Sequence, residues 1–105
     1  MNSEQYPRLI FECAYDERLA FEAEARGHLG GVTVELADGS KHRVFFYDPV
    51  RLQQDLDTEA DLGRPFIAEK GMIVLKAITL ENMKNAVNQL AKEGHFTAAA
   101  NDRTT

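Results

Sequence analysis

The sequence predicts an α+β fold: a mostly antiparallel sheet of four to five strands with two or three helices, ending in a long amphipathic helix. Three observations lead to this prediction. Residues 32–47 alternate apolar and polar side chains around a turn, which is typical of a half-buried hairpin. Residues 80–93 space their apolar side chains three and four apart, as in an amphipathic helix. Between these segments, Asp48 and Pro49 have the chemistry of a helix start.

The pattern of the central hairpin also predicts its register. Val32 and Val34 share one face of the first strand. A two-residue loop would place apolar side chains opposite charged ones on both faces. We therefore favour a three-residue loop with Gly39 in the left-handed conformation. This register has the cross-strand pairs Val32 with Val44, Val34 with His42, and Glu35 with Lys41.

The first part of the chain is less clear. Residues 8–14 read as a strand. Residues 16–26 are rich in Ala and Glu and are flanked by Asp16 and Gly27 as caps, which favours a helix. Their apolar side chains fall at alternate positions, however, and would make a poor stripe on a helix. We therefore favour a strand, which would make residues 8–25 one hairpin.

The second half of the chain is predicted as helix, hairpin and helix. A helix begins after Asp48, has a short apolar stripe of two leucines, and stops before Gly63. Residues 66–78 read as a hairpin that turns at a Lys-Gly dipeptide. Thr79 then caps the last helix, over residues 80–93.

Residues 1–96 are predicted to form a single domain, and residues 97–105 a disordered tail with nothing to bury. If residues 16–26 are helical, the element order begins β-α-β-β-α-β. That is the order of a ferredoxin-like sandwich, which we keep as the alternative architecture.

Composition and charge exclude several classes of function. The chain of 105 residues has a net charge of −5, and residues 48–61 hold five acidic residues against one arginine. An acidic centre repels phosphate backbones, so we expect no nucleic-acid partner. The longest apolar run, 72–75, is far too short to span a membrane, and the N-terminus lacks a signal-peptide pattern. The one cysteine, Cys13, reads as a buried free thiol; together these features favour a cytoplasmic protein without membrane contact.

Two surface features are candidates for binding a partner. Phe45 and Tyr47 alternate with the core residues of the second strand and therefore point to the opposite face of the sheet. Another element of the chain could cover them, or they could form an interface, where aromatic side chains are enriched. The second feature is an acidic run near a helix C-terminus, where the helix dipole disfavours negative charge. It comprises Asp55, Asp57, Glu59 and Asp61.

Motifs for catalysis or metal binding are missing from the sequence. The acidic run fails as a calcium loop because Ala60 and Phe66 stand where an EF-hand needs Gly and Glu. The histidines lack metal-ligand spacing, so we expect no metal and no cofactor. The one catalytic candidate is His42, which could act as a base beside a carboxylate such as Glu12.

The sequence therefore favours a small, acidic, non-enzymatic module that binds another protein. The partner would be a second copy, in a homodimer, or a basic protein that this chain inhibits or neutralises in the manner of an immunity protein. The alternative is a small acid/base enzyme or small-molecule binder that uses His42 and a neighbouring carboxylate.

Overall fold

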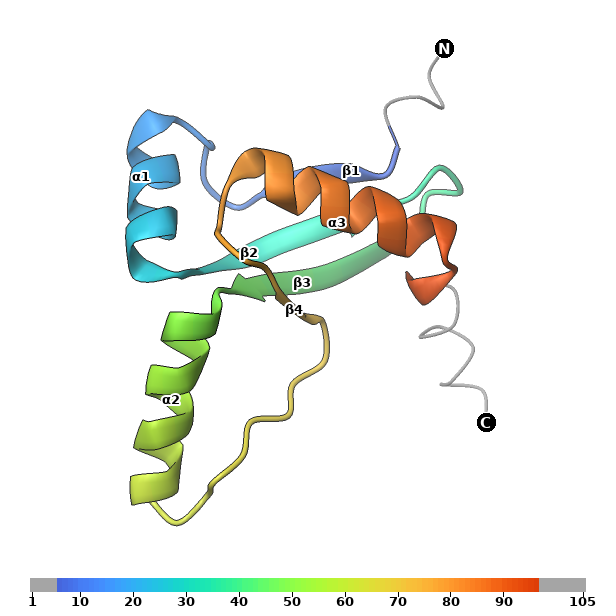
Figure 1. Cartoon of the computed structure of the whole chain (residues 1–105). Coiled ribbons are helices and arrows are strands. Elements are labelled where there is room, and N and C mark those ends of the chain that lie inside the picture. Colours follow the sequence, from blue (N-terminus) through green and yellow to red (C-terminus); the bar gives the residue numbers. More distant parts are fainter. Residues whose placement is uncertain (1–5, 97–105) are drawn as a thin grey trace.

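The computed structural model describes residues 6–96, which form an open, mostly antiparallel sheet of four strands with three helices (Figure 1). The predicted α+β fold class is confirmed. In chain order the elements are β1 (Arg8–Phe11), α1 (Glu17–Arg26), β2 (His28–Glu35), β3 (Lys41–Tyr47), α2 (Pro49–Asp61), β4 (Met72–Val74) and α3 (Leu80–Lys92).

The strands lie in sequence order, β1-β2-β3-β4. The first three are antiparallel neighbours, and β4 is parallel to β3. The β2–β3 hairpin has the predicted register, with Val32 opposite Val44, Val34 opposite His42, and Glu35 opposite Lys41. Gly39 has a φ of 90°, in the left-handed region that the three-residue loop requires.

The alternative architecture is wrong, although the element order β-α-β-β-α-β is present. A ferredoxin-like sandwich is built from split β-α-β units, in which the strands joined through a helix run parallel with another strand between them. Here β1 and β2 are joined through α1, yet they lie side by side and antiparallel. Helix α1 sits beyond the end of these strands in Figure 1, so the chain turns back without crossing the sheet.

The preference for a strand at residues 16–26 is also wrong, because the segment is the helix α1. Its ends follow the capping signals: the Asp16 Oδ1 accepts the Leu19 N–H at 2.9 Å, and Gly27 ends the helix with a φ of 72°. Within α1, Ala23 is buried but Phe21 is 74% exposed. A helix that buries so little needs no apolar stripe, so periodicity misled the prediction. Strand β1 consequently pairs with β2 and not with residues 16–26.

Two further expectations need correction. Residues 66–69 form no strand, so the predicted hairpin over 66–78 does not exist; only β4 forms, and it pairs with β3 instead. The cause is tertiary, since residues 66–71 are the return path of a parallel crossover. Strand β1 ends at Phe11, and Cys13 beyond it is exposed rather than buried.

The core lies between one face of the sheet, called here the inner face, and α3, which crosses in front of the strands in Figure 1. Phe46 and Met83 are fully buried in it, and Val87 is 1% exposed. Burying side chains of this size contributes about 1.5–3 kcal/mol each. As predicted, Thr79 caps α3, its Oγ1 accepting the Asn82 N–H at 3.1 Å.

The rest of the molecule contrasts with this core. We call residues 48–71, which contain α2 and its return to β4, the α2 arm; in Figure 1 it extends away from the end of the sheet. None of its side chains is buried. No helix within the described part of the chain is long and apolar enough to cross a membrane. The predicted tail at 97–105 lies outside the described residues.

Candidate functional site

Phe45 and Tyr47 lie on the sheet face opposite α3, called here the outer face, as the alternation predicted. Both are half-buried. The Tyr47 ring centroid lies 5.8 Å from that of Phe45 and 4.8 Å from that of His28. The three rings therefore form one aromatic cluster at the sheet end where the α2 arm begins.

Tyr47 also connects this cluster to α2. Its hydroxyl donates to the Asp55 Oδ2 at 2.7 Å, and the Arg51 Nε donates to the Asp55 Oδ1 at 3.1 Å. Burial, the hydrogen bond to Asp55 and the charge of that carboxylate raise the pKa of Tyr47 to about 12. The same hydrogen bond lowers the pKa of Asp55 below its ordinary value. Two of the predicted partner-binding residues thus act together to hold α2 to the sheet.

His28 completes the aromatic cluster, and the sequence interpretation missed it. Its place close to Gly27, Gly30 and Gly31 suggests a glycine loop, but His28 begins β2 and pairs with Tyr47. The register shift between Leu29 and Val32 carries the strand past the two glycines. The aromatic side chain before a glycine pair was the available signal. Burial, and then the Arg51 charge, lower the pKa of His28, which favours its neutral form.

The remaining residues of the acidic run stay on the surface of α2. Asp57 accepts a hydrogen bond from the Gln53 Nε2 at 3.0 Å, and Glu59 lies 3.5 Å from the Arg64 Nε. Asp61 forms no ion pair with any residue of 6–96. The last turn of α2 holds no basic side chain to offset its carbonyl dipoles. This end of the helix therefore presents largely uncompensated negative charge.

A hollow of about 450 Å³ lies between α2 and the return segment of the arm. Its walls come from Tyr47 and from the acidic face of α2 on one side, and from Arg64 to Glu69 on the other. The Arg64 guanidinium lies 4.7 Å from the centroid of the Phe66 ring. Phe66 itself is 50% exposed. The hollow thus combines apolar surface with charged side chains that are mostly acidic.

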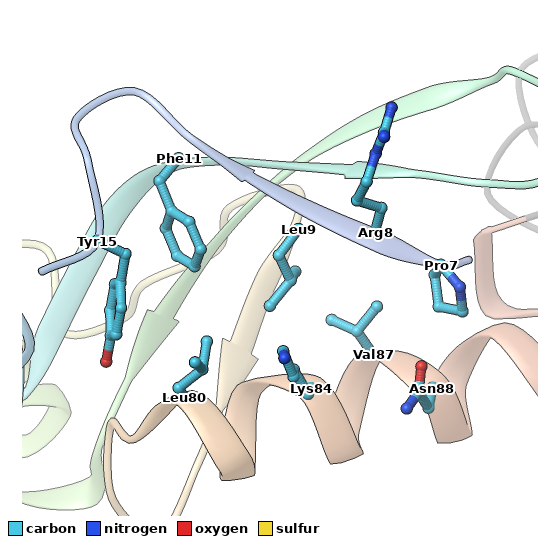
Figure 2. A pocket seen from close by; sticks show the side chains of 9 residues that line it. All are labelled: Pro7, Arg8, Leu9, Phe11, Tyr15, Leu80, Lys84, Val87 and Asn88. Carbon is cyan, nitrogen blue, oxygen red and sulfur yellow. The ribbon is translucent and has the colours of Figure 1, made fainter. Parts of the chain in front are cut away.

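A second groove, of about 460 Å³, runs between β1 and α3 on the inner face. Figure 2 shows Leu9 and Phe11 projecting from β1 toward Leu80 and Val87 of α3, whereas Arg8 points away from the groove. Leu9 and Phe11 are only half-buried, so the core stays partly open along β1.

The structure does not bring His42 and Glu12 together. His42 is half-buried on the inner face, with its Nε2 3.2 Å from the Ser40 Oγ and its ring 5.3 Å from that of Phe96. Glu12 lies on the outer face, where its carboxylate is 3.5 Å from an Arg43 guanidinium nitrogen. His42 lines neither the hollow nor the groove.

Among residues 6–96, no group of three His, Cys, Asp or Glu side chains is placed to hold a metal ion. A comparison with protein families, a search of curated proteins and a search of solved structures each found no match for the chain.

Proposed function

We propose that this chain is a protein-binding module whose α2 arm docks on a partner protein that carries basic side chains around an apolar patch. The observation that supports this is that the arm contains large apolar side chains and yet buries none of its side chains. It exposes Val50, Leu62 and Phe66 at 67%, 72% and 50%, and none of its side chains is buried by the chain itself. Exposed apolar surface that is rimmed by polar residues is typical of interaction sites.

Charge selects the kind of partner. The arm holds six acidic and three basic residues. Asp48 and Asp55 are engaged within the chain and Glu59 is paired with Arg64, but Asp57 and Asp61 form no ion pair with any residue of 6–96. Basic groups of a partner would meet both these carboxylates and the negative end of the helix dipole. A second copy of the chain, with its net charge of −5, complements the arm less well.

Quantitative affinity capture tests the proposal, with the intact chain immobilised and lysate of the native organism as the source of partners. Two arm variants are compared with wild type: Leu62→Ser with Phe66→Ser, and Asp57→Asn with Glu59→Gln and Asp61→Asn. All five side chains are at least partly exposed, so the fold should survive. The matched control neutralises three acids outside the arm, namely Glu24→Gln, Glu81→Gln and Glu93→Gln.

We expect wild type and control to retain a basic protein that is released by salt and that both arm variants lose. Arm variants that retain the same proteins at the wild-type level would contradict the proposal. The proposal would also be contradicted if the wild-type chain retained no protein beyond those that the arm variant with Asp57→Asn, Glu59→Gln and Asp61→Asn retains.

A further inference from the structure

Strand β1 is one of the two edge strands of the sheet. One hydrogen bond shows which of its residues direct their backbone N–H and C=O groups toward β2 and which direct them away from it. The Glu12 N–H donates to the Gly31 carbonyl of the β2 segment at 3.0 Å. In an antiparallel pair, alternate residues turn both backbone groups to the same neighbour. Arg8 and Ile10 therefore face β2 with Glu12, whereas Leu9 and Phe11 direct their N–H and C=O groups to the open edge.

The side chains of this edge form a self-complementary series. Residues 8–12 read Arg-Leu-Ile-Phe-Glu, with Ile10 at the centre. If a second copy of the strand lies antiparallel with Ile10 opposite Ile10, each Arg8 meets the Glu12 of the other copy, and each Leu9 meets the other Phe11. A two-fold interface requires this kind of series, because the same patch must recognise itself.

We infer that two copies of this chain associate through β1, antiparallel and centred on Ile10, so that the two sheets become one sheet of eight strands. Leu9 and Phe11 of opposite copies exchange their free backbone N–H···O=C hydrogen bonds, four in all. The inference concerns a different surface from the α2 arm and does not depend on the proposed function.

Backbone chemistry and charge select this register over its neighbours. In the neighbouring registers that still bring the open-edge N–H and C=O groups of the two strands face to face, the central residue is Leu9 or Phe11 instead of Ile10. Centring on Leu9 would place Pro7, which has no N–H, opposite Phe11. Centring on Phe11 would place Arg8 opposite the uncharged Ala14. Only the centre at Ile10 pairs opposite charges, and it gives every open-edge N–H and C=O group of β1 itself, at Leu9 and Phe11, a partner; Pro7 then lies opposite Cys13, where both residues are outside the strand.

The charges of the single chain are already arranged to continue across this contact. On the outer face the Arg8 Nε donates to the Glu35 Oε1 at 3.1 Å, and Glu35 lies opposite Lys41. The Glu12 of a second copy, placed outside Arg8, extends this row to Lys41, Glu35, Arg8 and Glu12 with alternating sign. Such opposite-charge neighbours stabilise a sheet. Ile10, which is 38% exposed in the single chain, is covered by its own equivalent.

The inner face gains apolar contact as well. The two-fold axis stands perpendicular to the joined sheet, so both α3 helices lie on the same side. Leu9 and Phe11 of the second copy then lie beside the half-buried Leu9 and Phe11 that line the groove between β1 and α3 (Figure 2), and extend its apolar wall. Edge pairing thus covers both a hydrogen-bonding edge and an incompletely closed part of the core.

Disulfide cross-linking tests the register directly. Ile10→Cys is made in a Cys13→Ser background, which removes the one native thiol. Opposed residues that do not exchange backbone hydrogen bonds have Cα atoms roughly 4.5 Å apart, within the range that a disulfide spans. The matched control is Val74→Cys in the same background, at an exposed apolar position on the opposite sheet edge. Mild oxidation should give a covalent dimer with Ile10→Cys, whereas equal or faster cross-linking of the control would overturn the inference.

A charge exchange gives an independent test in solution. Arg8→Glu alone and Glu12→Arg alone each place like charges opposite one another in both symmetric contacts, so each should self-associate about tenfold or more weakly than wild type. Mixed one to one, the two variants restore both opposite-charge contacts. Sedimentation equilibrium should therefore show heterodimers in the mixture at near the wild-type affinity.

Two results would overturn the proposed contact: a wild-type chain that stays monomeric at all concentrations, or variants whose mixture associates no better than either alone. Circular dichroism establishes that each variant is folded. If Arg8→Glu fails to fold beside Glu35, Ile10→Lys takes its place. The Ile10 side chain is exposed in the single chain, so the substitution Ile10→Lys should leave the fold intact and abolish the dimer. A folded, dimeric Ile10→Lys would reject the interface.

Discussion

The layer formed by the sheet and α3 differs from the α2 arm in what stabilises it. The layer buries a continuous apolar cluster, in which Phe46 and Met83 have no exposed surface. The arm is of similar secondary-structure quality, with a capped helix of 13 residues, but it buries none of its side chains. Good local signals are therefore enough to form a helix here, whereas burial distinguishes the part that sustains the fold from the part that we propose as the binding surface.

The largest difference between the two regions is expected from truncating a phenylalanine in each. Phe46→Ala removes a fully buried ring and should lower the free energy of unfolding by about 3–5 kcal/mol. Phe66→Ala truncates a half-exposed ring in the arm and should change it by less than about 0.5 kcal/mol. Urea denaturation followed by circular dichroism measures both. Similar losses for the two variants would show that the arm belongs to the same cooperative core.

Two glycines sharpen the boundary of the arm. Gly63 and Gly71 both have a positive φ, of 89° and 80°, so an added Cβ is strained by about 1–2 kcal/mol at either position. At Gly71 the Cβ would also overlap the Arg43 carbonyl of β3, whereas at Gly63 it meets open space. Gly71→Ala should therefore cost about 1–3 kcal/mol more than Gly63→Ala in the same denaturation experiment. Equal costs would mean that β4 is not fixed tightly against β3.

The helix caps provide a third comparison. Thr79→Ala removes the cap of α3, which packs on the core, and should lower the global free energy of unfolding by about 1 kcal/mol. Asp48→Ala removes the cap of α2, where the Arg51 N–H donates to its Oδ1 at 2.8 Å. Because α2 buries no side chain, it should fray locally, with faster hydrogen exchange at Arg51 and little global change. A global loss equal to that of Thr79→Ala would contradict the comparison.

The last comparison concerns the contact between the two regions, where we expect a small effect. Tyr47→Phe removes the hydroxyl that donates to Asp55 and should lower the free energy of unfolding by about 1 kcal/mol or less. The pKa of Asp55 should rise toward its ordinary value in this variant, as measured by carboxyl NMR titration. An unchanged Asp55 pKa would show that Tyr47 does not hold the carboxylate in solution.

The pH dependence of this contact has a definite sign. The folded pKa of Tyr47 is raised to about 12 from 10.0, so its contribution is full below pH 10 and is lost as the pH rises through about 12. The folded pKa of Asp55 is lowered, so its contribution is present above its ordinary pKa and is lost as the pH falls through the folded value. Tyrosinate absorbance should show a component that titrates near pH 12 in wild type and that is lost in Tyr47→Phe.

The sequence predicts the parts of the fold in which local and tertiary signals agree. Alternation and turn chemistry agree around Gly39, and the register of the hairpin is confirmed. Spacing and capping agree in α3, and that helix is confirmed from its cap at Thr79. The signals conflict at residues 16–26. There the capping residues correctly indicate a helix, whereas the periodicity wrongly indicates a strand. A mostly exposed helix does not need its apolar side chains on one face.

Local sequence patterns do not predict which distant strands pair or which side chains of different elements come into contact. The pattern of residues 66–78 does not indicate that β4 pairs in parallel with β3, because β3 is distant in the sequence. The outward aromatic pair was predictable from alternation, but the bond from Tyr47 to Asp55 depends on where α2 packs. The histidine of that cluster was hidden because the glycines after it resemble a loop, whereas they form an irregularity within β2.

The parallel pairing of β4 with β3 has a consequence for the order of folding. The β2–β3 hairpin closes over residues 36–40, whereas β4 reaches β3 only after the 24 residues of the arm have been looped back. Closing the longer loop costs roughly 1 kcal/mol more in chain entropy and is repaid by only three residue pairs. The hairpin should therefore act as the nucleus, and β4 should join late in the folding reaction.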